Sequence, residues 1–122
     1  MQFELLSAYG IDWKSGLVRC MNDEELYARL LSLFLQDTSF PSAVEALRRN
    51  DYSAAFDYLH DLKGSSGNAG LTELYNAVSP LVDALRNGKH PKPETSAQLG
   101  VITTAYIKSC TGIRRFLTEC DE

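Results

Sequence analysis

The 122-residue chain has the length of one domain, and its 44% hydrophobic content excludes a disordered protein. The net charge of −4 argues against nucleic acid or anionic lipid as the main partner. No apolar stretch reaches the ~18 residues of a membrane span, and the N-terminus lacks the basic region of a signal peptide. Three cysteines without a CxxC pair predict neither a disulfide framework nor a zinc site. We therefore expect a single cytoplasmic domain that covers residues 1–122.

The N-terminal part of the chain predicts short helices. Residues 3–9 and 12–21 each have a brief helical pattern. A 3.6-residue hydrophobic period then begins after Asn22, the expected N-cap, and continues through Phe34. A shorter amphipathic helix follows around residues 40–47.

Three longer helices follow in the remainder of the chain. The first covers residues 52–69 and stops at Gly70, and the second covers residues 71–85. Residues 90–93 predict an extended loop, after which the last helix carries the apolar residues of segment 99–117. Amphipathic helices with short connections predict an all-α fold: an antiparallel four-helix bundle, up-down-up-down, with short additional N-terminal helices.

His60 stands in the middle of one of the longer helices. Residues three and four apart share a helix face, so Lys63 and Gly64 flank the imidazole, while Leu62 points roughly 200° away. Gly64 and Gly67 lie on the histidine face, although each interior glycine costs about 1 kcal/mol relative to alanine. Destabilising glycines that lie on one helix face only, beside an exposed histidine, indicate that a partner comes close there.

The residue types on this face favour a histidine that carries phosphate. A neutral imidazole is a nucleophile near pH 7. A phosphoryl group on His60 brings roughly two negative charges, which the ammonium of Lys63 would stabilise. The sequence has no GxxxxGK[ST] or GxGxxG loop for ATP and no metal-ligand spacing such as HExxH. No second general acid or base accompanies the histidine, so an enzyme with its own small substrate is disfavoured.

The segment HDLKGSSGNAG, residues 60–70, closely resembles the phosphoacceptor motif of histidine-containing phosphotransfer (HPt) domains. The resemblance covers nearly the whole chain. It extends through these further segments: Gly10-Ile11-Asp12, Gly16-Leu17, Asp23-Glu24-Glu25-Leu26-Tyr27, and Leu74 to Leu85, which looks like the helix that pairs with the phosphoacceptor helix.

The resemblance implies a phosphorelay intermediate of a two-component signalling system. His60 would accept a phosphoryl group from the aspartate of a response-regulator receiver domain and pass it to another receiver, with a hybrid sensor histidine kinase as a further partner. Lys63 would stabilise the phosphoryl group, and Gly64 would leave room for the active site of the receiver. The receiver would supply Mg²⁺ and most catalytic groups, so this chain would need no cofactor and would not itself be an enzyme. We also expect it to be a monomer.

Some members of the family hold the imidazole with an amide or basic side chain of the next helix. A hairpin that turns near Gly70 places residues 80–83 opposite His60, and none of these is an amide. Ser79 and Arg86 are the candidates for that role. Three further residues are expected to form the binding surface around the histidine: Phe56, Asp57 and Gly67.

Two alternatives remain at this point. The dimerisation and phosphoacceptor domain of a histidine kinase has a similar motif, but it usually continues with threonine or asparagine and then proline, where this chain has Gly64-Ser65. It is also a two-helix hairpin that dimerises, whereas this chain has enough helices to close a bundle alone. The second alternative is a helical interaction module that has lost phosphotransfer, in which His60 could be replaced without consequence.

Overall fold

The computed structural model describes residues 1–88 and 92–120, and this part of the chain is all-helical, as predicted. The elements in chain order are the 3-10 helix η1 (Phe3–Tyr9) and the α-helices α1 (Trp13–Arg19), α2 (Glu24–Gln36), α3 (Ser39–Arg48), α4 (Tyr52–Asn68), α5 (Thr72–Arg86) and α6 (Lys92–Cys120). The predicted loop over residues 90–93 lies partly outside the described residues, and Lys92 and Pro93 belong to the first turn of α6.

Aspartates begin three of these helices. The carboxylates of Asp12, Asp23 and Asp51 each accept a hydrogen bond of 3.1–3.2 Å from the backbone N–H three residues later. Such a side chain satisfies one of the N–H groups that the first helical turn leaves unpaired. The predicted cap of α2 was wrong by one residue: Asn22 lies in the preceding turn with φ +60°, and Asp23 is the cap.

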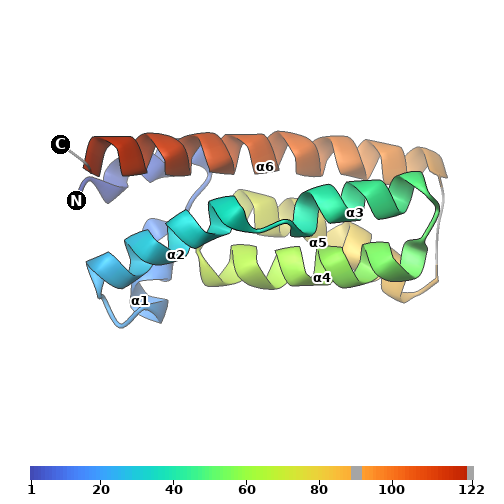
Figure 1. The fold of residues 1–122 in the computed structure, drawn as a ribbon, viewed down its shortest axis with the longest axis horizontal. Helices are drawn as coiled ribbons and strands as arrows, with labels where there is room; N and C mark the ends of the chain where they lie inside the picture. The colour runs from blue at the N-terminus through green and yellow to red at the C-terminus, as the bar shows by residue number, and fades with distance from the viewer. Residues whose placement is uncertain (89–91, 121–122) are drawn as a thin grey trace.

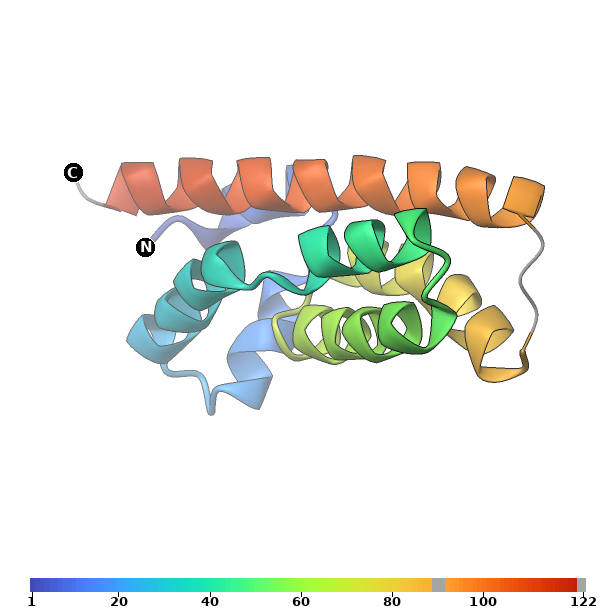
Figure 2. The same cartoon turned by 45° about the vertical axis from the view of Figure 1, so that its right-hand side comes forward.

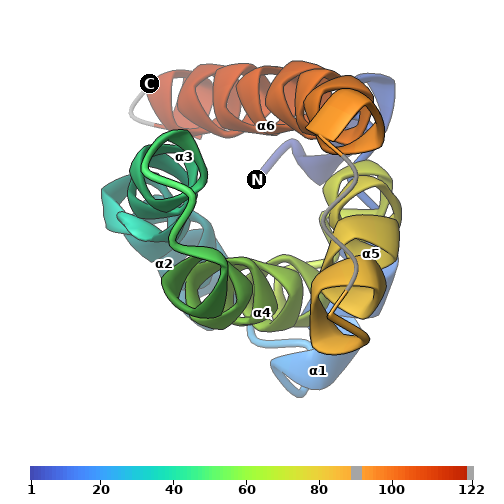
Figure 3. The ribbon, with the colours of Figure 1, turned by 90° about the vertical axis from the view of Figure 1, so that its right-hand side faces the viewer.

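Four helical columns enclose the core. Figure 1 shows α2 and α3 one after the other along one side of the molecule, followed by α4, α5 and α6 in alternating directions. In the end view of Figure 3 these columns surround a common centre. Helix α4 packs between α3 and α5, and α6 packs against α5 and α2. The predicted up-down-up-down bundle is therefore confirmed, with one column divided into two helices.

The division between α2 and α3 has a local cause. Asp37 ends α2 in an extended conformation, and its carboxylate accepts a 2.7 Å hydrogen bond from the N–H of Ser39. Pro41 follows in the first turn of α3, where the missing N–H costs nothing. A proline at this place would break a continuous helix, so the column restarts.

The core follows the predicted apolar faces. Helix α4 buries Ala55, Leu59, Leu62 and Ser66, as its sequence pattern indicates. Cys20 is buried as well. The buried side chains of α5 and α6 include Leu74, Val78, Leu81, Ile102, Ile113 and Phe116.

The N-terminal helices pack on one end of this bundle. Figure 2 shows η1 alongside α6. The ring of Phe3 stacks on Phe116 of α6 with centroids 4.8 Å apart, and on Trp13 of α1 at 5.9 Å. The hydroxyl of Tyr27 in α2 donates a buried hydrogen bond of 2.7 Å to the carbonyl oxygen of Ala69, at the end of α4.

Two backbone hydrogen bonds hold the start of α1 against the turn between α4 and α5. The N–H of Asp12 donates to the carbonyl of Gly70 at 2.7 Å, and the N–H of Glu73 donates to the carbonyl of Gly10 at 3.1 Å. Gly70 has a φ of +75°, a conformation that glycine adopts without the strain of a side chain. This turn therefore places α1 beside the C-terminal half of α4. No helix in residues 1–88 and 92–120 combines the length and the apolar character needed to cross a bilayer.

Candidate functional site

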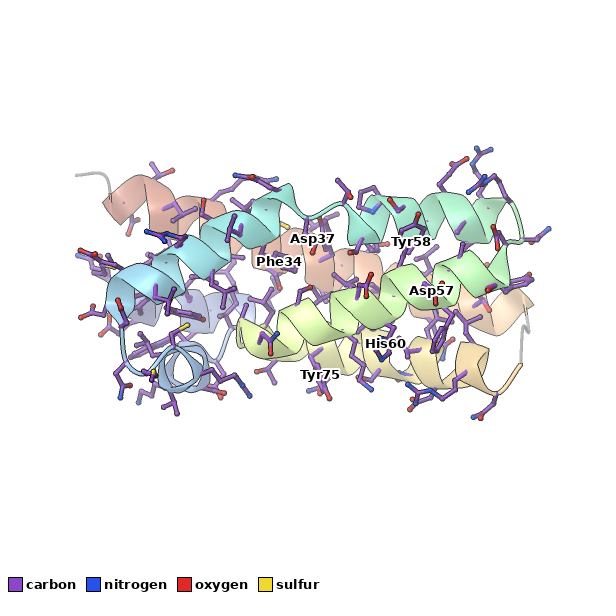
Figure 4. All side chains as sticks on the ribbon, turned by 60° about the horizontal axis from the view of Figure 1, so that its bottom comes forward. Phe34, Asp37, Asp57, Tyr58, His60 and Tyr75 are labelled. Atoms are coloured by element: carbon purple, nitrogen blue, oxygen red, sulfur yellow. The ribbon has the colours of Figure 1, made fainter. Side chains whose placement is uncertain are left out.

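His60 lies at the middle of α4 with its side chain exposed. Figure 4 shows it on the side of α4 that faces α5, whereas Tyr58 lies toward α3. Gly64, one turn further on, is exposed, and a Cβ added there would meet no atom within 4 Å. The backbone beside the imidazole is therefore open to close approach, as the sequence predicts.

Phe56, one turn before His60, contacts the imidazole. The two rings are stacked with centroids 5.7 Å apart and planes inclined by 28°. Arg86, at the end of α5, places its guanidinium carbon 5.6 Å from the centre of the Phe56 ring. Its Nη1 also lies 3.4 Å from a carboxylate oxygen of Asp83, one turn earlier on α5. Phe56 thus links the histidine of α4 to a cation of α5.

Lys63 is half-buried, and a second aromatic ring determines its environment. Its Nζ lies 5.6 Å from the centre of the Tyr75 ring of α5. Cation–π contacts of this kind contribute ~0.5–1 kcal/mol at exposed sites. A Cβ added at Gly67 would lie 3.2 Å from the same ring. The sequence pattern ascribes both glycines to the approach of a partner. Close packing against α5 accounts for Gly67 instead, while Gly64 does face open space.

His60, Lys63 and Gly64 line one side of an open groove of about 680 Å³. The groove is bounded by three helices, and its lining includes Arg19 of α1, His60, Lys63 and Gly64 of α4, and Tyr75 and Asn76 of α5. Arg19 donates a 2.6 Å hydrogen bond to the hydroxyl of Ser15, another groove residue. Two cations, Arg19 and Lys63, thus line the same groove as the histidine in a protein whose net charge is negative.

The remaining predicted residues make no hydrogen bond to the imidazole. The hydroxyl of Ser79 donates to the carbonyl of Tyr75 within α5, at 2.7 Å. Arg86 contacts Phe56 and Asp83 rather than His60. Asp57, labelled in Figure 4, is exposed and does not line the groove. Within residues 1–88 and 92–120, no group hydrogen-bonds either imidazole nitrogen of His60.

Sequence reasoning missed Asn76 and the contribution of α1. Asn76 is an amide of α5 that lines the same groove as His60, nearer the start of α5 than the predicted residues 80–83. The spacing of Thr72, Tyr75 and Asn76 places all three on one helix face, which is a signal that the sequence contains. No comparable signal brings Arg19 there, because its position depends on the backbone contact between α1 and the α4–α5 turn.

The groove is lined by one imidazole, that of His60. The described residues hold no cluster of His, Cys, Asp and Glu able to bind a metal ion. One exposed histidine instead stands on a rigid helix, beside an ammonium and an open stretch of backbone.

The chain belongs to the Hpt domain family, whose pattern it matches over residues 29–121. Members of this family act in histidine phosphotransfer within phosphorelays, as intermediates with receiver-domain partners and not as classical enzymes. No curated protein and no solved structure matches the chain.

Proposed function

We propose that His60 is the phosphoacceptor of this domain, and that it takes the phosphoryl group from an aspartyl phosphate of one receiver domain and donates it to the aspartate of another. The observation that carries this proposal is the exposed imidazole of His60 beside the unobstructed Gly64, within the segment that matches the family. A hybrid sensor histidine kinase would supply the first receiver.

The chemistry needs little from this chain. A lone pair on one imidazole nitrogen attacks phosphorus, the N–P bond forms, and the P–O bond to the aspartyl carboxylate breaks with its electron pair leaving on the carboxylate oxygen. The other ring nitrogen can release its proton to water afterwards. Donation to the next receiver is the reverse reaction. Mg²⁺ bound by the receiver would neutralise charge on the transferring group.

Lys63 and Gly64 would assist in different ways. The Lys63 ammonium, one turn from His60, would stabilise the negative charge that the phosphoryl group brings to α4. The lack of a side chain at Gly64 would let the receiver bring its aspartate within bonding distance of the imidazole. Neither role requires a bound cofactor in this chain.

We also propose that residues 1–122 act as one domain and as a monomer. The family match begins at residue 29, yet Phe3 packs on Phe116 and Tyr27 bonds to Ala69, so the first 28 residues share a core with the matched part. The four columns close within one chain. This supports a monomer over a two-helix dimerisation domain, which would need a second chain to complete its bundle.

The test is phosphoryl transfer from a chemically phosphorylated receiver domain in the presence of Mg²⁺. We expect an acid-labile label on the wild-type protein, an equal label on His90→Gln, which replaces the only other histidine, and none on His60→Gln. Label that persists on His60→Gln would overturn the assignment. A folded wild-type protein that takes no label from several receivers would instead favour an interaction module that has lost phosphotransfer.

A further inference from the structure

The imidazole of His60 has no hydrogen-bond partner among the described residues, yet it isn't without support. One of its faces contacts the ring of Phe56 at 5.7 Å, and Arg86 lies over that ring at 5.6 Å. We refer to these three side chains as the Arg86–Phe56–His60 stack. It joins the middle of α4 to the last turn of α5 at the edge of the hydrophobic core.

Stacking restrains a histidine differently from a hydrogen bond. The torsion that turns an imidazole about its Cβ–Cγ bond has broad minima, so an unsupported ring samples many orientations. An aromatic ring packed against one face of the imidazole narrows this range of orientations. A hydrogen bond to a ring nitrogen would also do so, but it would occupy one of the two atoms able to react. The in-plane lone pair that attacks phosphorus lies at the ring edge, which the stack leaves uncovered.

Arg86 gives the stack its anchor. A guanidinium attracts the negative face of an aromatic ring, and Asp83 holds the guanidinium from one turn earlier on the same helix. Phe56 is half-buried, so its ring would otherwise be restrained only on the side that meets the core. The cation also lies in the last turn of α5, where the helix dipole favours positive charge.

We propose that Phe56 is a positioning residue for phosphoryl transfer, that it holds the His60 imidazole by stacking, and that Arg86 holds Phe56. This inference rests on the proposed role of His60 as phosphoacceptor. The proposal predicts a slower phosphoryl transfer within the complex with the receiver, because the orientation of the nucleophile matters after docking. A Phe56 that served only as a docking contact would instead change KM.

The experiment compares four variants of the full chain with wild type. Phe56→Leu removes the aromatic face, Arg86→Gln removes the cation, and Arg86→Lys retains it. Tyr58→Leu is the matched control, since it removes an aromatic ring from another side of the same helix. Two readouts are used. The first is the ring-proton resonances of His60 in the free protein by NMR. The second is single-turnover transfer from a phosphorylated receiver, which gives a rate constant at saturating receiver, here called kcat, and a half-saturating receiver concentration, here called KM.

We expect Phe56→Leu to lower kcat about three- to tenfold with little change in KM, because the nucleophile loses its preferred orientation. The His60 ring resonances should lose the shift that a stacked aromatic ring produces. Arg86→Gln should change both readouts in the same direction by a smaller factor. Arg86→Lys, which keeps the cation, should stay close to the wild-type values, and Tyr58→Leu should match wild type.

Wild-type kcat together with unchanged His60 resonances in Phe56→Leu would overturn the proposal. A rise in KM alone would also overturn it and make Phe56 a docking contact. The two readouts separate this inference from the proposed function. If the wild-type protein accepts no phosphoryl group, the role of His60 fails, whereas the resonances of the free protein still show whether the stack holds the ring.

Discussion

The two faces of helix α4 differ in burial and packing. On one face Leu59 and Leu62 are 0% and 1% exposed and pack into the bundle. On the other face His60 and Gly64 are exposed, and the glycine has nothing near it. The first face holds the fold together, and the second contributes little packing. The difference teaches that residues on the histidine face can be replaced to test function without unfolding the protein.

The largest expected effect is on the buried face. Leu62→Ala should lower the free energy of unfolding by about 2–5 kcal/mol, because it removes a fully buried side chain and leaves a cavity. His60→Gln, two residues away, should change it by less than about 0.5 kcal/mol. Denaturant unfolding of both variants measures this contrast. Equal losses of stability would contradict the division of α4 into two faces.

The next effect concerns charge on the open face. Lys63→Ala should slow phosphoryl transfer by about three- to tenfold, because an exposed charge pair contributes far less than the ~4 kcal/mol of a pair 4 Å apart at an effective dielectric of 20. Lys14→Ala is the matched control. Its ammonium also lies over an aromatic ring, that of Trp13 at 5.5 Å, but outside the groove. A similar loss in both variants would remove Lys63 from the site.

The glycines of α4 provide a smaller and sharper test. Gly64→Ala should raise the free energy of unfolding by up to about 1 kcal/mol, since the added methyl group meets open space and alanine is the better helix former. The same variant should slow transfer, because the methyl group occupies the approach to His60. Gly67→Ala should gain less stability, since its methyl group would crowd the ring of Tyr75.

Gly100→Ala is the control for this glycine comparison. Gly100 also lies within a helix, α6, with nothing within 4 Å of an added Cβ, and it doesn't line the groove. It should therefore gain the same stability and leave transfer unchanged. If Gly64→Ala also left transfer unchanged, the idea that Gly64 makes room for the receiver would fail.

The smallest expected effect is a loss of folding stability at alkaline pH, caused by the ionisation of two tyrosines, Tyr27 and Tyr106. Burial raises the pKa of Tyr27, whose hydroxyl bonds to the end of α4, and raises the pKa of Tyr106 to about 12. In the unfolded chain a tyrosine ionises near pH 10. Folding therefore favours the neutral phenol, and stability present below pH 10 should fall as the pH rises from about 10 to 12.

Denaturant unfolding at pH 8 and pH 11 measures this loss. Tyr106→Phe should reduce the difference between the two pH values, because phenylalanine has no proton to lose. Tyr58→Phe, which removes an exposed phenol of α4, should leave it as in wild type. A pH dependence that is the same in all three proteins would show that the phenol of Tyr106 does not contribute to it.

Local patterns in the sequence were enough to predict the helices and the two faces of α4. The 3.6-residue period of Ala55, Leu59 and Leu62 is a property of one segment, so it needs no knowledge of the partner helices. The positions of His60 and Gly64 on the opposite face follow from the same period. The cap of α2 was misplaced by one residue because asparagine and aspartate both suit an N-cap and stand side by side.

Only the tertiary structure decided which side chains of other helices meet the histidine face. Asn76 reaches the groove and Arg86 reaches Phe56 because of how far α5 is shifted along α4, which the turn at Gly70 and the packing of the core determine. Arg19 enters the groove through the backbone bond between Asp12 and Gly70, residues far apart in the chain. Helical periodicity determines the direction of each side chain around its own axis, and it contains no information about the relative shift of two helices.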